Sequence, residues 1–223
     1  MEKIQVDNEV ARLRILKAAH EGKRFALQDA VTFQYPKRIQ SLEKELQLLQ
    51  KDLERRNQAM EVQPGFAITL QGKVYEKHKE AGEVLRGIIE GVTAFTRHEV
   101  GMYKGFQVSV QNDMLGPILF LQGEKEYSVE LKSSDSGNMV RIENRLNALD
   151  KAVEDVQKEI KTCENEIKNA KQEYEKPFPY EELLKENITR QMEIDAELEI
   201  KDQEECVEVQ EETKNLPCQT AVR

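Results

Sequence analysis

The longest periodic run of hydrophobic positions lies between residues 146 and 174. Its seam residues recur at alternating intervals of three and four, and most of the positions between them are polar or charged. This spacing predicts one helix with a coiled-coil seam, about 45 Å long at ~1.5 Å per residue. The seam consists of Leu146, Leu149, Val153, Val156, Ile160, Cys163, Ile167, Ala170 and Tyr174.

A shorter seam of the same kind follows Pro36, a residue that suits the first turn of a helix. Its members are Ile39, Leu42, Leu46, Leu49 and Leu53. Because more than ninety residues separate the two seams, the second helix has room to return beside the first. We therefore expect a long antiparallel helical coiled-coil stalk. A homodimer through the 146–174 seam is the alternative.

Between the seams the hydrophobic period changes from about 3.6 to 2, as in strands that bury one face. Gln71 and Gly72 separate two short β-type runs, which is a hairpin signal. A helical pattern follows over residues 77–95, and then three further segments read as strands: 101–113, 116–123 and 124–132. The segment predicts a small ββαβββ head inserted into the stalk, so the predicted fold class is α+β.

The first and last parts of the chain predict further helices. Residues 1–20 place Val6, Val10, Leu13 and Lys17 on one helical face, which Ile15, Leu16 and Ala19 widen, and Gly22 is expected to end this helix. At the other end, Pro177 and Pro179 disfavour helix and form a corner around Phe178. We expect the helix after this corner to fold back on residues 1–35, where its acids would face basic residues.

These patterns predict five segments. They are the N-terminal helices with the first stalk helix (1–62), the head (63–140), the second stalk helix (141–176), a C-terminal helix (177–201) and an acidic, disordered tail (202–223).

Composition agrees with long helices, since 34% of the 223 residues are charged and Trp is absent. The net charge of −9 is concentrated near the C-terminus, where residues 181–212 hold 13 acidic residues against three basic ones. The rest of the chain is close to neutral, so the whole-chain charge does not exclude nucleic acid as a partner there. No apolar run is long enough for a membrane span, no signal sequence is expected, and three widely spaced cysteines indicate reduced thiols; we expect a cytoplasmic protein.

Motifs that carry chemistry are missing from the sequence. It has no phosphate-binding glycine loop, no nucleophile elbow, no HExxH or CxxC spacing and no Cys/His cluster. We therefore expect no enzyme activity, no cofactor and no metal site. An enzyme with its site in the head is the weakest alternative.

Basic clusters interleaved with aromatic residues are the one candidate for a binding site, because such clusters suit a phosphate backbone. The alternative interpretation is that they are solvated helix faces paired with nearby acids. In the head, Tyr103 and Phe106 beside Lys104 suit base stacking if they are exposed. The candidate nucleic-acid-binding residues are Arg12, Arg14, Lys17, Lys23, Arg24, Lys37, Arg38, Arg55, Arg56 and Lys104.

Several linked segments carry a resemblance to a known group of proteins. They include "DNEVARLRILKAAH", "YPKRIQSLEKEL", "GFAITLQGKVYEKHKEAGEVL", "GMYKGFQVSV", "EYSVELKSSDSGNMVRIENRLNALD" and "ENEIKNAKQEYEKPFPYEELLKENITRQMEID". In this order they resemble the C-terminal accessory region of large bacterial mobile-element proteins. Those proteins combine a Swi/Snf-type helicase with an adenine-specific DNA methyltransferase.

The resemblance implies a non-catalytic accessory module of a DNA-processing protein, which positions DNA or the motor. The partners it implies are the helicase and methyltransferase regions of a parent protein, with DNA as a further candidate and no membrane. The alternative is a structural protein–protein interaction module without DNA contact, either monomeric or a homodimer.

Overall fold

The computed structural model describes residues 2–114 and 116–214, with side chains up to residue 200. The described chain is mixed helix and sheet, with long helices and one six-stranded antiparallel sheet. It divides into two compact units. We call residues 33–167 the central unit, and residues 1–32 together with 168–223 the terminal unit.

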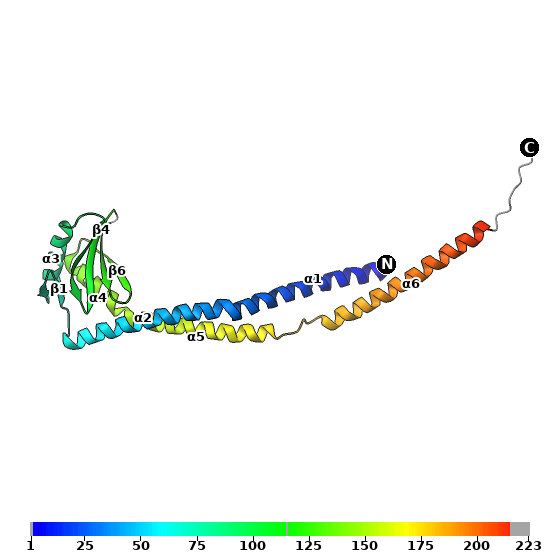
Figure 1. Ribbon diagram of the computed structural model, residues 1–223, viewed down its shortest axis with the longest axis horizontal. Coiled ribbons are helices and arrows are strands. Elements are labelled where there is room, and N and C mark those ends of the chain that lie inside the picture. The colour runs from blue at the N-terminus through cyan, green and yellow to red at the C-terminus, as the bar shows by residue number, and fades with distance from the viewer. Residues whose placement is uncertain (1, 115, 215–223) are drawn as a thin grey trace, which may run out of the picture. The chain divides into compact units, whose positions relative to one another are not determined.

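The sheet lies in the central unit, and its strand order is β2-β1-β3-β4-β5-β6 with every neighbouring pair antiparallel (Figure 1). Side chains alternate along the strands, so one sheet face is apolar and the other is largely polar. The strands are β1 (Ile68–Leu70), β2 (Lys73–Tyr75), β3 (Arg97–Tyr103), β4 (Phe106–Asp113), β5 (Gly116–Gln122) and β6 (Glu126–Glu130).

The expectation of five strands is wrong, because the segment predicted as one strand over 101–113 is a hairpin of β3 and β4. Lys104 (φ 46°) and Gly105 (φ 80°) form its two-residue turn. Gln71 (φ 49°) and Gly72 (φ 79°) form the matching turn between β1 and β2, as predicted. Positive φ at both central residues gives the twist that antiparallel strands need, and glycine adopts it without strain.

Two helices, α3 (His78–Glu90) and α4 (Asp135–Asn147), pack on the sheet and against each other. Gly82 permits their close approach, because a Cβ there would lie 2.4 Å from the Asp135 carbonyl oxygen. The N-cap Ser134 accepts a hydrogen bond from the Gly137 amide, so α4 begins at Asp135, before residue 141 where the second stalk helix was expected to start. The core combines Ala81 and Leu85 of α3 and Met139, Ile142 and Leu146 of α4 with the apolar strand residues.

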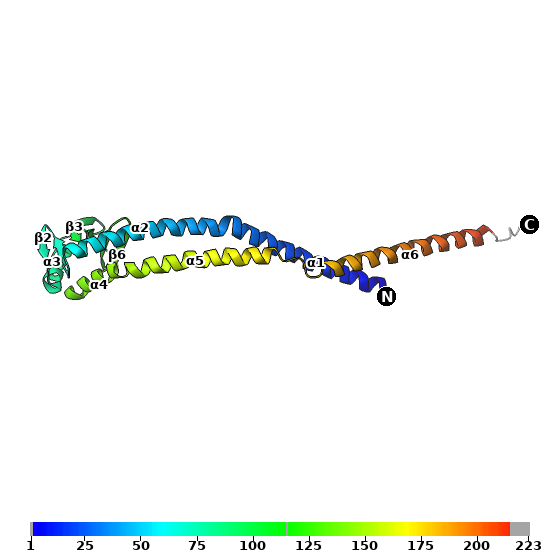
Figure 2. The same cartoon turned by 90° about the horizontal axis from the view of Figure 1, so that it is seen from below.

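The central unit also contains α2 (Tyr35–Val62) and the first part of α5 (Leu149–Tyr174). Within this unit the two helices lie side by side and run in opposite directions (Figures 1 and 2). Leu49 of α2 and Leu149 and Val153 of α5 belong to one buried cluster with the sheet. Every residue of the two predicted seams is buried or half-buried. The expectation of one helix over residues 146–174 is wrong, however, because the helix breaks at Ala148 and Leu146 lies on α4.

The terminal unit pairs α1 (Glu2–Asp29) with α6 (Glu181–Lys214). Val10, Leu13 and Leu184 form its buried core, and Phe178 packs against them from the segment between α5 and α6. The prediction that the last helix folds back on the N-terminal residues is confirmed. A π-helical stretch, η1 (Ala30–Gln34), follows α1.

Three expectations about these helices are wrong. Gly22 does not end α1, because the helix continues to Asp29. Ile15 and Leu16 are exposed, since one neighbouring helix covers only a narrow stripe of α1. The acidic tail was expected to be disordered from residue 202, but α6 continues to Lys214, as its many Glu, Gln and Lys residues favour. The rest of that prediction, residues 215–223, lies outside the described residues.

Candidate functional site

The basic residues predicted for the terminal unit mostly have acidic partners in the same unit. Lys17 Nζ lies 2.9 Å from Glu181 Oε1, and Lys23 Nζ lies 3.2 Å from Glu173 Oε2. Arg12 Nη1 donates to Glu9 Oε1 at 3.1 Å, one helical turn away. The side-chain hydrogen bond from Lys17 holds the pKa of Glu181 below its ordinary value. These cations are therefore already neutralised locally.

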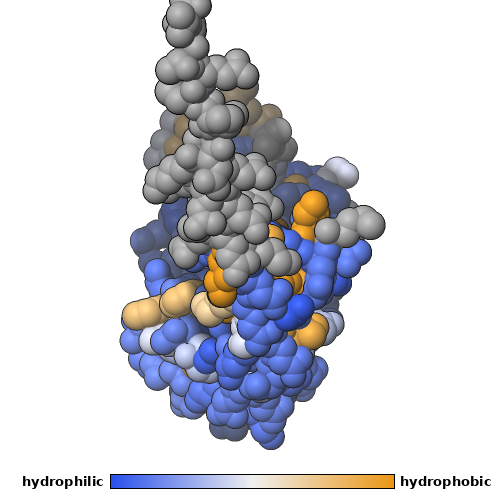
Figure 3. All heavy atoms as spheres, turned by 90° about the vertical axis from the view of Figure 1, so that its right-hand side faces the viewer, coloured by the Kyte–Doolittle hydropathy of each residue, from blue (hydrophilic) through white to orange (hydrophobic). Residues whose placement is uncertain are grey.

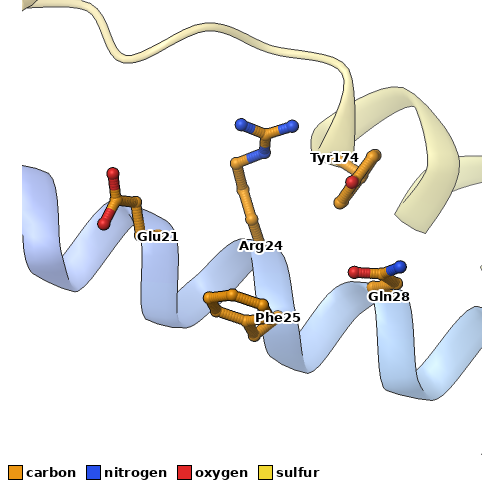
Figure 4. Close-up of a pocket in the computed structure, with 5 residues that line it drawn as sticks. All are labelled: Glu21, Arg24, Phe25, Gln28 and Tyr174. Atoms are coloured by element: carbon orange, nitrogen blue, oxygen red, sulfur yellow. The ribbon is translucent and has the colours of Figure 1, made fainter.

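Arg24 lines an open pocket of about 390 Å³ with Glu21, Phe25, Gln28 and Tyr174 (Figure 4). Its guanidinium carbon lies 4.6 Å from the centre of the Tyr174 ring, a cation–π distance. Phe25 extends from the other side of α1 in this view. The Arg24 Nε atom is buried and makes no hydrogen bond within the described residues. The pocket thus presents one cation stacked on an aromatic ring, with the polar side chains of Glu21 and Gln28 also in its lining.

Most basic candidates of the central unit are engaged in the same way. Arg38 forms an ion pair with Glu159, and Arg55 Nη2 lies 3.0 Å from Glu124 Oε1. Lys104 Nζ donates to the backbone carbonyls of Gln63 at 2.7 Å and Gly65 at 2.5 Å. Burial lowers the pKa of Lys104.

Arg56 is the clearest structural cation, because only 7% of it is exposed. Its Nη1 donates to the Leu146 carbonyl at 3.0 Å and to Asp150 Oδ2 at 2.6 Å, and its Nη2 donates to Asn57 Oδ1 at 2.7 Å. The hydrogen bond from Arg56 lowers the pKa of Asp150. Arg56 therefore ties α2 to the junction of α4 and α5, and it offers no charge to a nucleic acid.

Arg14 and Lys37 are the two candidates that make no hydrogen bond, ion pair or cation–π contact within the described part of the chain. They belong to different units, Arg14 on α1 and Lys37 on α2. The ten candidates therefore do not assemble into one basic surface within either unit.

A polar site that sequence reasoning missed lies at Asp52, which is fully buried and lies near the C-terminal end of the first seam. Its carboxylate accepts from the Glu124 amide at 2.7 Å, the Lys125 amide at 2.9 Å and the Tyr127 hydroxyl at 2.7 Å. Burial, with this hydrogen bond next, raises the pKa of Tyr127. Asp52 thereby fixes α2 to the turn between β5 and β6. In the sequence, the one indication that Asp52 is buried is its position between the seam residues Leu49 and Leu53.

The aromatic residues beside Lys104 are buried, which contradicts the idea of a base-stacking surface there. Tyr103 is 2% exposed and Phe106 is fully buried, with their rings in the core. The polar sheet face instead carries Arg97, whose guanidinium carbon lies 3.8 Å from the centre of the Phe120 ring. Arg97 also donates to Ser109 Oγ at 2.9 Å and pairs with Glu126 at 2.7 Å. This cation too is held by its own unit.

Groups that could carry out chemistry are few among the residues the structure describes. His78 Nε2 lies 3.2 Å from Glu143 Oε2, and its ring stacks on Phe66 at 4.0 Å. Among the same residues, no group of three or more His, Cys, Asp or Glu side chains is placed to bind a metal ion. None of the described helices combines the length and the apolar character needed to cross a bilayer.

Comparisons with known proteins add no relative from which a site could be transferred. No family model, curated protein or solved structure matches this chain. The function proposed for this chain is therefore inferred from its own residues and contacts.

Proposed function

We propose that this chain is a non-catalytic protein-interaction module that uses an antiparallel coiled coil as a spacer for the α+β head. On the basis of the resemblance described above, we propose that the chain belongs to a larger DNA-processing protein. Its head and helices would position the helicase and methyltransferase regions of that protein. In this proposal the chain contributes distance and orientation, and it contacts protein rather than DNA.

The observation that carries the proposal is the match in register between the two seams. When α2 and α5 run antiparallel, one alignment places all five α2 seam residues opposite α5 seam residues. Leu53 then faces Leu149, Leu49 faces Val153, Leu46 faces Val156, Leu42 faces Ile160 and Ile39 faces Cys163. Layers of this kind are the unit of a coiled coil.

The contacts of the central unit support this alignment. Leu46 and Leu53 of α2 and Val156 of α5 pack around the cluster that contains Leu49, Leu149 and Val153. The pairs Arg38–Glu159 and Arg56–Asp150 flank the same seam. Because the head lies in sequence between α2 and α5, it sits at one end of this helix pair.

The pairing of the basic residues favours protein over DNA as the partner. A DNA-binding surface gains affinity from cations that are free to replace counterions on phosphates. Here eight of the ten candidates already contact acids, carbonyls or an aromatic ring of their own unit. Breaking such contacts would offset the gain from binding a phosphate.

Thiol cross-linking tests the coiled coil. In a Cys206→Ser, Cys218→Ser background, we expect Ile39→Cys to join Cys163 through a short bismaleimide within one chain. The matched control, Gln40→Cys, lies one residue away at an exposed position and should not be cross-linked to Cys163. A cross-linked dimer in place of a cross-linked monomer would support the homodimer through the 146–174 seam. If Cys163 reacts with a monofunctional maleimide but no cross-link forms, both arrangements are refuted.

A titration of labelled duplex and single-stranded DNA tests the second part of the proposal. We expect the intact chain to bind neither form at physiological salt. Tight, salt-dependent binding that Arg14→Glu and Lys37→Glu weaken would replace this proposal with the DNA-positioning function.

A further inference from the structure

The outward side of α1 carries a second heptad pattern that the α1–α6 contact does not use. Seven residues recur at intervals of four and three over this side, and none of them is charged. We call them the outer seam: Ile4, Asn8, Ala11, Ile15, Ala18, Gly22 and Phe25. With 3.6 residues per turn they lie opposite Val10 and Leu13, which face α6.

All seven positions are exposed, and the large side chains are exposed to an unusual degree. The exposed fractions are 65% for Ile4, 70% for Ile15 and 72% for Phe25. Hydrophobic residues interrupt the hydrophilic surface of the molecule in Figure 3. A regular apolar stripe in a chain with 34% charged residues indicates a surface that another helix covers.

Gly22 is an independent sign of close approach by another chain. It lies inside α1, where glycine is unfavourable relative to alanine. A Cβ at this position would meet nothing within 4 Å, so contacts within the chain do not require glycine. With Ala11 and Ala18, it leaves room for a neighbouring helix to pack closely against the backbone of α1.

We propose that a second copy of this chain covers the outer seam, with the two α1 helices packed antiparallel. The inference rests on the proposed function as an interaction module, and it names the partner of the outer seam. The charges beside the seam determine the orientation. Arg14 and Glu21 flank it on one side, seven residues apart, and neither has an ion-pair partner among the described residues.

In an antiparallel pair the residues on this side of the seam face their equivalents on the other helix. Arg14 then lies opposite Glu21 of the second copy, and the symmetry forms this ion pair twice. In a parallel pair Arg14 would face Ala19, and Glu21 would face Ala26, so both charges would stay unpaired.

Within the seam from Asn8 to Phe25, the same antiparallel register places bulky residues opposite small or uncharged ones, while Ile4 at the end of the seam falls opposite Asp29 of the second copy. Ile15 faces Ala18 of the second copy, and Asn8 faces its Phe25. Ala11 faces Gly22 of the second copy, which allows the two backbones to approach. Alternation of large and small residues across a helix pair is what close packing needs.

Sedimentation equilibrium of the full chain over a wide range of concentrations tests the inference. We expect a dimer that Ile15→Asp converts to a monomer, while circular dichroism shows unchanged helix content. The matched control is Met192→Asp, which changes a side chain of similar exposure (66%) on α6 and should leave the dimer intact. A monomeric native chain, or a dimer that Ile15→Asp leaves unchanged, would overturn the proposal.

A charge swap tests the orientation without touching the apolar seam. Arg14→Glu and Glu21→Arg should each weaken the dimer about tenfold or more, and the double variant should restore it. Lys37→Glu, with the same charge change on another helix, is the control and should have little effect. If the double variant fails to restore the dimer, the antiparallel register is wrong. Because the cross-link between Ile39→Cys and Cys163 does not depend on dimerisation, failure here leaves the spacer proposal standing.

Discussion

The central and terminal units bury very different amounts of apolar surface. Twenty buried hydrophobic residues form one cluster in the central unit, whereas Val10, Leu13 and Leu184 are the three buried members of the cluster between α1 and α6. The terminal unit adds ion pairs at its surface, among them Lys3–Asp195 and Lys17–Glu181. Exposed ion pairs stabilise little compared with apolar burial. The central unit should therefore be the stable part, and the terminal unit should open more readily.

The largest effect is expected from Asp52→Ala in the central unit. The change leaves two amides and the Tyr127 hydroxyl without their buried acceptor, so we expect a loss of about 3–5 kcal/mol in the free energy of unfolding. Urea unfolding followed by circular dichroism measures it. Asp52→Asn, which keeps one acceptor oxygen, should lose less. An Asp52→Ala variant as stable as the native chain would mean that the hydrogen bonds do not hold α2 to the sheet.

Leu13→Ala should give the clearest difference in stability between the two units, because it should destabilise the terminal unit alone. It removes one of the three buried residues of the cluster between α1 and α6, and we expect a cost of about 2–3 kcal/mol for α1–α6 packing. Hydrogen–deuterium exchange with peptide resolution should show faster exchange in α1 and α6 and unchanged exchange in the sheet. The control is Leu16→Ala on the same helix, which is exposed and should change neither. Equal changes in both units would refute their energetic independence.

The sequence predicted the helix seams well because burial along a packed helix follows its period. Each member of the two predicted seams is buried or half-buried, although the first seam has only five members. The strand β3 was missed because Gly101 weakens its apolar pattern. Gly101 is needed there because a Cβ would lie 1.8 Å from the Thr69 carbonyl oxygen of the neighbouring strand. That close approach depends on sheet pairing, which local pattern does not contain.

The candidate binding residues were harder to predict, because their exposure also depends on contacts between distant parts of the chain. Clusters such as Arg55 and Arg56 look alike in sequence, yet Arg55 is partly exposed and Arg56 is buried against Asp150. Whether a cation is free depends on acids far away in the chain: Glu181 lies 164 residues from Lys17. Residue type and spacing alone therefore could not separate a phosphate-binding cluster from a set of intrachain ion pairs.

Asp150→Asn tests the polar junction of the central unit through its dependence on pH. Arg56 lowers the pKa of Asp150 in the folded chain below its ordinary value of 3.8. The pair therefore contributes its full stability above that value and loses it as the pH falls through the lower, folded pKa. At pH 7 we expect the variant to be less stable by about 1 kcal/mol, because Asp150 is largely exposed.

Urea unfolding of both chains at pH 7 and near pH 3 measures this difference. The gap in unfolding free energy should narrow at the lower pH, where the native carboxylate begins to accept a proton. Lys158→Gln, which alters exposed i,i+3 and i,i+4 pairs on α5, serves as a control and should show no such narrowing. A gap that stays constant with pH would mean that the Arg56–Asp150 contact does not stabilise the fold.

The smallest expected difference between the two units is their response to salt. At 1 M salt the Debye length falls to about 3 Å, so the exposed pairs between α1 and α6 are screened, while apolar burial is not weakened. We expect hydrogen–deuterium exchange of α6 to rise modestly between low and high sodium chloride, with no change in β4 and β5. Lys17→Gln should reduce this response, because it removes the pair that also lowers the pKa of Glu181. If salt left α6 unaffected, the three-residue core and Phe178 would be sufficient to hold it, and the surface pairs would serve specificity of pairing rather than stability.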